Sequence, residues 1–420
     1  MSITAHIFGI NRQAQRSTAL GRLWQQLAIA TNWPVLVSIA VLCALGVCSI
    51  WADRAAPADG KKQLFFIAVG SACLVAFQAV NYQKIGRWAW GFYVVALLLI
   101  CYTIVPFTHA DSASHALLRV PKRNGAYAWI NFGPMALQPA ELMKIGFVMV
   151  MARYLRFRSN YRTLKGLLAP FALALVPLAL IMKQPDLGTA LTFIPTLFVM
   201  LFVAGAKMKH LLAIMALGLA VAPILWLAGP AEDGGPGLPV LKHLPVMVKK
   251  YQRERVQAMF ADDPKTDRDK GYQQKLAMTA FGSGGVTGKG IGQIPVGEHV
   301  PERHNDMVFA LIGEQFGLFG AAVVLGAYGI LFAAGIEIAS NTREPFGRLV
   351  AVGVVAMLAG QTFLNLMVCL KLMPVTGLTL PFVSYGGSSL VASFIAAGLL
   401  LNIGQNRPFV VARDSFEYDR

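Results

Sequence analysis

Charged residues are scarce in this sequence. Only 14% of its 420 residues are Asp, Glu, Lys or Arg, against roughly 25% in a typical soluble domain. Hydrophobic residues make up 56% of the chain. So few charges cannot cover the surface of a soluble protein of this length, which excludes a string of soluble domains. The composition instead favours a polytopic membrane protein.

Cysteine is scarce as well. The sequence has five cysteines, and they form no CxxC pair and no cluster with histidine. This pattern excludes a disulfide framework and a cysteine-based zinc site, and it is typical of small buried apolar side chains. All of them fall in apolar runs: Cys43, Cys48, Cys73, Cys101 and Cys369.

Acidic residues are fewer than basic ones, 21 against 37, so the formal net charge is +16. A basic total also occurs in nucleic-acid-binding proteins. In a chain this apolar, it indicates instead the excess of Lys and Arg that cytoplasmic loops of membrane proteins contain. We therefore expect no nucleic-acid partner.

Long apolar runs predict about ten transmembrane helices of roughly twenty residues each. Their continuity, without alternation of period two, favours helices over a β-barrel. The predicted fold class is an all-α polytopic membrane protein with a large extracytoplasmic loop between spans 7 and 8. The runs are centred near Ile39, Val69, Leu97, Val148, Leu175, Leu197, Leu217, Val324, Val355 and Ala397.

Lys and Arg predict the orientation of these spans. If both termini are cytoplasmic, the basic short connections alternate correctly with the others. We thus predict a cytoplasmic segment 1–32, a transmembrane domain 33–406 containing the extracytoplasmic loop 229–304, and a cytoplasmic tail 407–420. The basic connections contain Lys84, Arg87, Arg153, Arg156, Arg158, Arg162, Lys165, Lys207, Lys209, Arg343 and Arg348.

A basic amphipathic stretch between Leu241 and Phe260 predicts a short helix in the large loop. Val256 and Met259 share one face in this pattern, and Arg253 lies nearer the other face. Two interpretations remain open: a helix that lies on the lipid headgroups, and a solvated loop helix.

Glu141 and Lys144 are ionisable residues in a predicted span, within LQPAELMKIGFVMV. Pro139 suits the first turn of that helix. The spacing of three places both side chains on one face, where a Glu–Lys pair offsets part of its burial cost. A helix-stabilising ion pair and a functional pair are both compatible with this pattern.

Asp186 and Asp306 each precede another span, in KQPDLGTA and VPERHNDMVFALIGEQFG. Each position suits a helix N-cap, which is the simpler interpretation. Lys371 interrupts an apolar run, and its long side chain can extend to the membrane surface. Together with Glu141, these residues fall in the predicted outer half of the membrane. The sequence therefore predicts a polar pocket that opens outward.

The run GSGGVTGKG lacks the first glycine and the final Ser or Thr of a P-loop. Two interpretations remain: a flexible turn at the membrane surface, and a loop whose N–H groups and Lys289 meet a lipid diphosphate. His299 and His304 are five residues apart and no HExxH motif is present, so we assign no transition-metal site. A Mg²⁺ or other divalent cation shared with substrate phosphates stays open.

Several segments together resemble the SEDS family (shape, elongation, division and sporulation), the RodA- and FtsW-like peptidoglycan polymerases. They run in family order from about Gly125 to Asn406, and GSGGVTGKG is closer to the RodA branch. Ala128 stands where Arg is common in the family, and Asn305 where Thr is usual. The matching segments are GAYAWINFGPMALQPAELMKI, KQPDLGTA, YQRERV, GYQQKLAMTAFGSGGVTGKG, VPERHNDMVFALIGEQFG and LPFVSYGGSS.

The resemblance implies a glycosyltransferase that polymerises lipid II into β-1,4-linked glycan strands on the outer face of the bacterial cytoplasmic membrane, releasing undecaprenyl diphosphate. It implies that Asp306 is catalytic, and we expect this residue to act as the general base. Arg255 and Lys289 are our candidates for binding the diphosphate. The other residues expected at the substrate cavity are Glu141, Lys144, Asp186, Glu302, Lys371 and Ser384.

The expected partners are lipid II, membrane lipid, and a class B penicillin-binding protein that crosslinks the product. The alternatives are a lipid II flippase or other transporter, and a non-catalytic scaffold of a cell-wall synthesis complex. Clustering of ionisable residues in the outer half disfavours a transporter, because alternating access favours midplane sites. The resemblance fits a role in cell elongation and in cell division equally.

Overall fold

In a computed structural model of the chain, the described residues are 32–53, 57–110, 117–123, 125–133, 135–228, 248, 250–260 and 271–406. The predicted cytoplasmic segment, apart from its last residue, lies outside the described residues, and so do the predicted tail 407–420 and residues 229–247 of the large loop.

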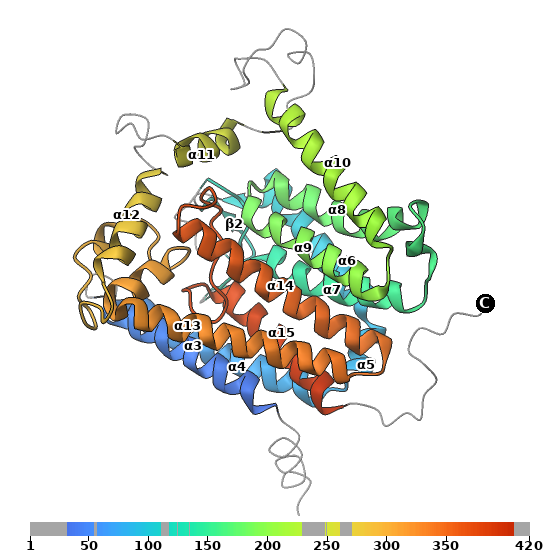
Figure 1. The fold of residues 1–420 in the computed structure, drawn as a ribbon, viewed down its shortest axis with the longest axis horizontal. Coiled ribbons are helices and arrows are strands. Elements are labelled where there is room, and N and C mark those ends of the chain that lie inside the picture. The colour runs from blue at the N-terminus through green and yellow to red at the C-terminus, as the bar shows by residue number, and fades with distance from the viewer. Residues whose placement is uncertain are drawn as a thin grey trace, which may run out of the picture.

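The chain forms a helical bundle (Figure 1), which confirms the predicted all-α fold class. Each of the ten predicted runs lies in one helix of the bundle. These helices are α3 (Trp33–Trp51), α4 (Pro57–Ala79), α6 (Ala89–Ile104), α7 (Pro139–Arg156), α8 (Leu168–Lys183), α9 (Leu187–Ala204), α10 (Met208–Leu227), α13 (Val308–Asn341), α14 (Pro345–Cys369) and α15 (Gly387–Gln405).

Eight of these described helices are long and apolar enough to cross a membrane. The two others are α6, an apolar helix of 16 residues, and α7, which has 18 residues and contains four charged side chains. Pro139 occupies the first turn of α7, as predicted. The four charges of α7 are Glu141, Lys144, Arg153 and Arg156.

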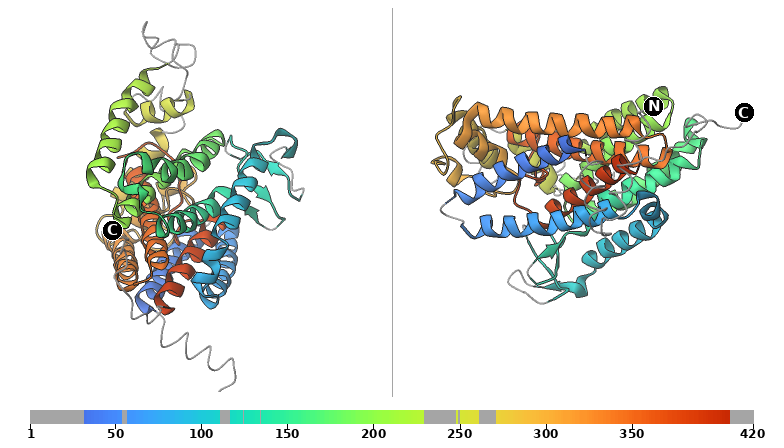
Figure 2. Two further views of the ribbon diagram at one scale, coloured as in Figure 1. Left: turned by 90° about the vertical axis from the view of Figure 1, so that its right-hand side faces the viewer. Right: turned by 90° about the horizontal axis from the view of Figure 1, so that it is seen from below.

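Close packing of helices is made possible by small residues. A Cβ atom at Gly398 of α15 would lie 2.7 Å from the main-chain oxygen of Leu74 in α4. Helix association inside lipid depends on such close backbone approach, because apolar burial alone does not favour protein over lipid. α15 lies in the middle of the bundle, whereas α10 lies along its outside (Figure 2).

The basic connections meet at one end of the bundle. Arg153 donates a hydrogen bond to the main-chain oxygen of Gly86 in α5 (Tyr82–Arg87) at 2.9 Å. Arg156 lies 3.1 Å from Glu344, which caps α14. The connections that the sequence assigns to one side of the membrane are therefore neighbours in space.

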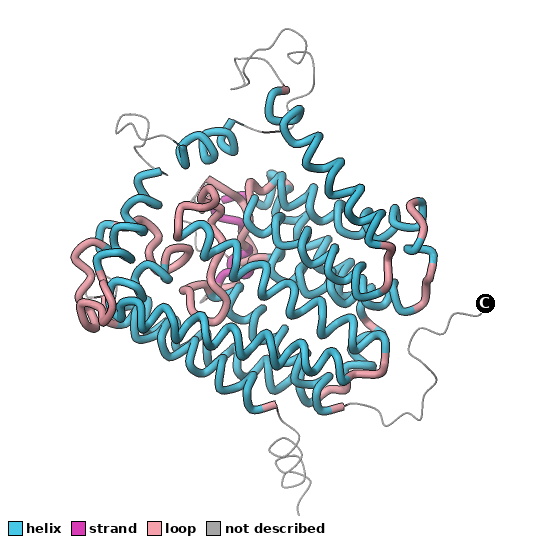
Figure 3. Tube along the Cα trace, in the orientation of Figure 1, coloured by secondary structure: helices cyan, strands magenta, loops and turns pink. Residues whose placement is uncertain are grey.

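The opposite end holds the connections that contain the predicted site. Short strands form two-residue ladders: β1 (His109–Ala110) pairs in parallel with β2 (Val120–Pro121), and β3 (Ile130–Asn131) pairs antiparallel with β4 (Ala136–Leu137). Figure 3 draws strands in magenta among the helices. Helices α11 (Lys250–Phe260) and α12 (Gly271–Ser283) belong to the large loop. Single 3-10 turns are η1 (Pro106–Thr108), η2 (Asn160–Arg162), η3 (Lys165–Leu167) and η5 (Gly297–His299).

The structure corrects the prediction for the basic face of α11. Arg253 is 2% exposed, and its guanidinium donates to the main-chain oxygen of Ala228, just after α10. Gln252 is buried beside it. The carbonyl groups at the end of a helix need donors, so this part of the basic face turns toward protein and away from lipid headgroups or solvent.

Candidate active site

Asp306 lies between the 3-10 turn η5 and helix α13, and it is 5% exposed. Its carboxylate accepts a hydrogen bond from the side-chain amide of Gln273 in α12 at 3.3 Å. The N-cap of α13 is Met307, without a side-chain cap bond. The simpler interpretation of Asp306 as the cap of this helix is therefore wrong, and its carboxylate is available for another role.

The main chain of Asp306 is held by α14. Asn365 donates to the main-chain oxygen of Asp306 at 2.8 Å and to that of Leu378 at 2.6 Å. The thiol of Cys369, one turn further along α14, approaches the same oxygen of Asp306 at 3.3 Å. Helices α12 and α14 thus fix the side chain and the main chain of Asp306 respectively.

Burial raises the pKa of Asp306 from its ordinary value of 3.8 to about 7. The residue's own backbone N–H opposes this rise, the nearby charge of Glu302 adds to it, and the nearby charge of Arg255 opposes it. A carboxyl group with this pKa is populated in both protonation states near neutral pH, which suits a general base.

Two predicted residues, Glu302 and Arg255, surround Asp306. Glu302 has a left-handed backbone (φ 50°), and the side chain of Asn305 donates to its carboxylate. Arg255 comes from α11 and donates to the main-chain oxygen of Val375 at 3.0 Å. The large loop therefore brings Arg255 from a distant position in the sequence to the same aspartate that Glu302 approaches from within its own segment.

Glu141, Lys144 and Asp186 form a second polar cluster. Lys144 lies 2.9 Å from Glu141 and donates to the side chain of Gln361 in α14 at 2.7 Å. Both members of the ion pair are nearly buried, at 4% and 3% exposed. The predicted pairing is confirmed, and the side chain of Gln361 on α14 accepts a second hydrogen bond from the Lys144 ammonium group.

Asp186 is the N-cap of α9, as predicted. Its carboxylate accepts from the N–H and the hydroxyl of Thr189, at 2.9 and 2.7 Å. The side chain of Gln138 donates to it at 2.8 Å, which joins α7 to α9. Burial raises the pKa of Asp186, and the Thr189 bonds lower it.

The two clusters are joined through α14. Gln361 holds Lys144 and donates to the main-chain oxygen of Thr379 at 2.8 Å. Asn365 lies one turn further and holds Asp306 and Leu378. Among the described residues, no hydrogen bond or ion pair joins Asp306 directly to Glu141 or Asp186. The sequence predicts one shared pocket. The structure instead has two polar clusters, each of which contacts an amide side chain on the same face of α14.

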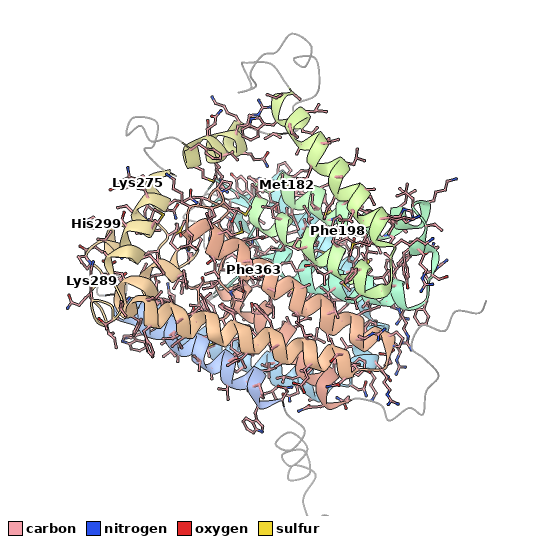
Figure 4. The ribbon with its side chains drawn as sticks, in the orientation of Figure 1. Met182, Phe198, Lys275, Lys289, His299 and Phe363 are labelled. Carbon is pink, nitrogen blue, oxygen red and sulfur yellow. The ribbon has the colours of Figure 1, made fainter. Side chains whose placement is uncertain are left out.

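Lys289 lies elsewhere, and its predicted role in diphosphate binding is not supported by its contacts. Its ammonium group is 2.7 Å from Glu314, whose side chain is fully buried. It also donates to Ser283 at 2.6 Å. An unpaired charge at Glu314 would be costly, so Lys289 neutralises it. Figure 4 shows Lys289 at the edge of the molecule, near His299.

The glycine-rich run packs against helix α13 and forms main-chain hydrogen bonds with it. The N–H groups of Lys289 and Gly290 donate to the main-chain oxygens of Glu314 and Gln315, at 2.9 and 3.0 Å. These carbonyls are free because α13 is broken at Gly317, which has a left-handed backbone (φ 64°). The N–H groups of Lys289 and Gly290 are therefore bound within the protein and are not available to a phosphate.

Ser384 and Lys371 are also used locally. The hydroxyl of Ser384 accepts from the N–H of Leu380 at 2.7 Å, which closes a turn. Lys371 follows the end of α14 with a left-handed backbone (φ 57°) and is half-buried. Within the described ranges, no ion pair involves Lys371.

Sequence reasoning missed the amide side chains of the site. Gln138, Gln273, Gln361 and Asn365 position the charged residues, yet amides belong to no recognisable motif. Gln361 and Asn365 lie four residues apart within an apolar span, where polar side chains are costly. The same cost that singled out Glu141 would have found them.

The part of the chain that the structure describes contains no group of three or more His, Cys, Asp or Glu side chains that could hold a metal ion. These described residues do not fit a resident metal centre, and we derive no step through one. A cavity of about 370 Å³ between α6, α7 and α8 contains none of the predicted site residues. Its lining is Trp90, Tyr93, Tyr154, Ala169, Ala172, Leu173 and Val176.

Comparison with known proteins gives consistent matches over most of the chain. "Stage V sporulation protein E" of Bacillus subtilis is 30% identical over 379 residues, covering 88% of this chain and 94% of that protein. "Probable peptidoglycan glycosyltransferase FtsW" of Geobacter metallireducens is 32% identical over 386 residues, covering 88% and 93%.

Solved structures agree with these relatives. A chain of the structure titled "Structural coordination of polymerization and crosslinking by a peptidoglycan synthase complex" matches with a TM-score of 0.74 and 31% identity, covering 91% of this chain and 100% of that chain. The rod shape determining protein RodA of Thermus thermophilus matches with a TM-score of 0.63 and 28% identity, covering 90% and 98%.

The family resemblance is confirmed, whereas assignment to the RodA branch in particular stays a prediction. The sequence model of the FtsW/RodA/SpoVE cell cycle proteins matches residues 24–408. The chain therefore belongs to the FtsW/RodA/SpoVE family of integral membrane proteins.

Proposed function

We propose that this chain is a peptidoglycan glycosyltransferase that polymerises lipid II, with Asp306 as the general base. Relatives that match 88% of the chain are named as probable enzymes of this kind. The observation that carries the proposal is the buried carboxylate of Asp306, whose pKa of about 7 lets it accept a proton at neutral pH.

In this reaction, Asp306 takes the proton from the 4-hydroxyl of the acceptor's GlcNAc. The hydroxyl oxygen forms a bond to the anomeric carbon of the donor's MurNAc. The bond from that carbon to the phosphate oxygen breaks, and its electron pair leaves with undecaprenyl diphosphate. Because attack comes from the opposite face, the configuration inverts to the β-1,4 linkage. The diphosphate is already a good leaving group, so one base suffices and a glycosidase-like carboxylate pair is unnecessary.

Negative charge that develops on the diphosphate needs a cation. Arg255 is the candidate among the described residues, because its charge acts on Asp306 and therefore lies near the reacting atoms. Glu141, Lys144 and Asp186 would shape the neighbouring cluster, which α14 joins to Asp306 through Gln361 and Asn365.

The basic end of the bundle would face the cytoplasm, with both termini, and the Asp306 end would face outward. Lipid II would then be used on the outer face of the cytoplasmic membrane, with its tail in lipid. The similarity to a chain of a synthase complex whose title names both polymerization and crosslinking supports a transpeptidase of the class B penicillin-binding protein type as partner.

The test is an assay of purified protein, together with its cognate transpeptidase, on labelled lipid II. Glycan strands from wild type and none from a folded Asp306→Asn protein would support the proposal. Equal amounts of glycan strands from both proteins would show that Asp306 is not the general base. No strands from either, combined with movement of lipid II across vesicle membranes, would favour a flippase.

A further inference from the structure

His304 lies between two carboxylates that come from another part of the chain. Its Nε2 is 2.9 Å from Oδ2 of Asp53, and its Nδ1 is 3.3 Å from Oδ2 of Asp59. Asp53 follows the end of α3, and Asp59 lies in the first turn of α4. The side chains of His304 and Asp53 are nearly buried, at 8% and 3% exposed, whereas that of Asp59 is 30% exposed.

The two contacts of His304 constrain which of its ring nitrogens carry a proton. An ionised carboxylate only accepts hydrogen bonds, whereas a neutral imidazole has one donor nitrogen and one acceptor nitrogen. A neutral ring would therefore direct a lone pair at one of the two carboxylates. Both contacts are hydrogen bonds only when both ring nitrogens are protonated, and each bond is then charge-assisted.

The surrounding charges balance in this state. Nε of Arg303 is 2.6 Å from the same Oδ2 of Asp53, and its guanidinium also donates to the main-chain oxygen of Glu298 at 2.8 Å. The N–H of Tyr385 donates to the main-chain oxygen of His304 at 2.8 Å. With Arg303 and a protonated His304 against Asp53 and Asp59, two positive charges face two negative ones.

The same short segment contains Asp306, two residues further on. Helices α12 and α14 hold Asp306 through Gln273 and Asn365. The contacts of His304 attach the segment to α3 and α4 instead. His304, together with Arg303, therefore supplies the attachment that α12 and α14 do not.

We propose that His304, protonated on both ring nitrogens and bound between Asp53 and Asp59, is a positioning residue that holds the Asp306 segment against the junction of α3 and α4. Its importance for the reaction rests on the proposed function of Asp306. Its protonation and contacts do not. Loss of the second proton breaks one of the two bonds and loosens the base.

Asp59→Asn is the informative variant, because Asp59 is partly exposed and its replacement is compatible with folding. The side-chain amide that this substitution introduces can donate to Nδ1 of His304, so a neutral ring with its proton on Nε2 satisfies both neighbours. The matched control is Glu298→Gln, which alters a carboxylate 3.9 Å from the exposed ring of His299 in the same loop.

The first measurement is nitrogen NMR of histidine-labelled full-length protein in nanodiscs at neutral pH, with the His304 signal assigned by its absence from His304→Gln. We expect two protonated ring nitrogens at His304 in wild type and in Glu298→Gln, and an unprotonated Nδ1 in Asp59→Asn. An unprotonated ring nitrogen in wild type, or the same protonation state in wild type and Asp59→Asn, would overturn the proposal. This result is independent of whether the chain polymerises lipid II.

The second measurement is the pH profile of polymerisation. We expect kcat of His304→Gln to fall by on the order of tenfold to a hundredfold with KM little changed, because a misplaced base slows chemistry without weakening substrate binding. A decline of wild-type activity at alkaline pH that follows from loss of the second ring proton should be absent from Asp59→Asn, whose ring is already neutral, and should stay in place in Glu298→Gln. The same decline in Asp59→Asn as in wild type, or a loss in His304→Gln confined to KM, would show that His304 does not position the base.

Discussion

The side-chain amide of Asn365 holds the main-chain oxygen of Asp306 at 2.8 Å, across 59 residues of sequence. The same amide donates to Leu378 at 2.6 Å, so one buried side chain fixes both the candidate base and the loop beside it. The position of Asp306 is therefore a property of α14 as much as of its own segment.

Replacing Asn365 with Ala should both destabilise the protein and slow the reaction. The carbonyl of Leu378 loses its donor, and an unsatisfied buried acceptor costs about 1–3 kcal/mol. Asp306 also loses part of its support. The measurement is thermal unfolding in detergent together with kcat on lipid II. Thr196→Val is the matched control, because the buried Thr196 hydroxyl donates to the main-chain oxygen of Thr192 within its own helix, α9. Equal kcat in Asn365→Ala and wild type would contradict this role.

Breaking the buried Glu141–Lys144 pair should cost more stability than breaking an exposed pair. Lys144→Met leaves the Glu141 carboxylate uncompensated at 4% exposure, at a cost of about 3–5 kcal/mol. The double replacement Glu141→Leu with Lys144→Met should recover much of that loss. Thermal unfolding of wild type, the single variants Lys144→Met and Glu141→Leu, and the double variant forms a double-mutant cycle.

The comparison for this cycle is Arg156→Gln at the basic end. Arg156 is 36% exposed and pairs with Glu344 at 3.1 Å, so solvent screening limits its worth to about 0–1 kcal/mol. If Lys144→Met were no more destabilising than Arg156→Gln, the buried pair would contribute little to the fold.

Lys289→Ala should destabilise the protein while leaving kcat/KM per folded molecule close to wild type. The fully buried Glu314 keeps the N–H donors of Val296 and Gly297, at 3.1 and 2.7 Å, but loses its cation. The measurement is unfolding temperature beside kcat/KM on lipid II. A large fall in kcat/KM with unchanged stability would instead support the predicted binding of the diphosphate by Lys289.

Arg255→Gln should move the rise of activity to higher pH. The carboxylate of Asp306 is the active form, so activity increases as pH rises through its pKa of about 7. The charge of Arg255 lowers that pKa, and its removal therefore raises it. The pH profile of kcat/KM checks this, with Lys275→Gln as the control for loss of an exposed cation on α12. If activity rises at the same pH in Arg255→Gln as in wild type, the charge of Arg255 does not act on Asp306.

Much of the fold follows from the sequence, because spans and caps depend on local patterns. The ten apolar runs, Pro139 in a first turn and Asp186 as an N-cap are visible within one or two helical turns. The ion pair of Lys289 with Glu314 could not be predicted in this way. Glu314 is 25 residues away, and the two side chains meet through tertiary packing near the break of α13 at Gly317.

The site could be predicted only in part for the same reason. Asp306 and Glu141 are conspicuous as charges among apolar residues. The amides that position them are not, since Gln361 reaches Lys144 across 217 residues and Gln273 reaches Asp306 across 33. Such contacts depend on tertiary packing, which periodicity and spacing do not contain.

The most direct measurement is kcat/KM on lipid II as a function of pH for wild type and a folded Asp306→Asn protein, each with the cognate transpeptidase present. With Asp306 as the base, wild-type activity rises through an inflection near pH 7. The variant should lose about 10²–10⁴-fold and retain no inflection there. Comparable rates in both proteins, or an inflection that persists in Asp306→Asn, would contradict the assignment.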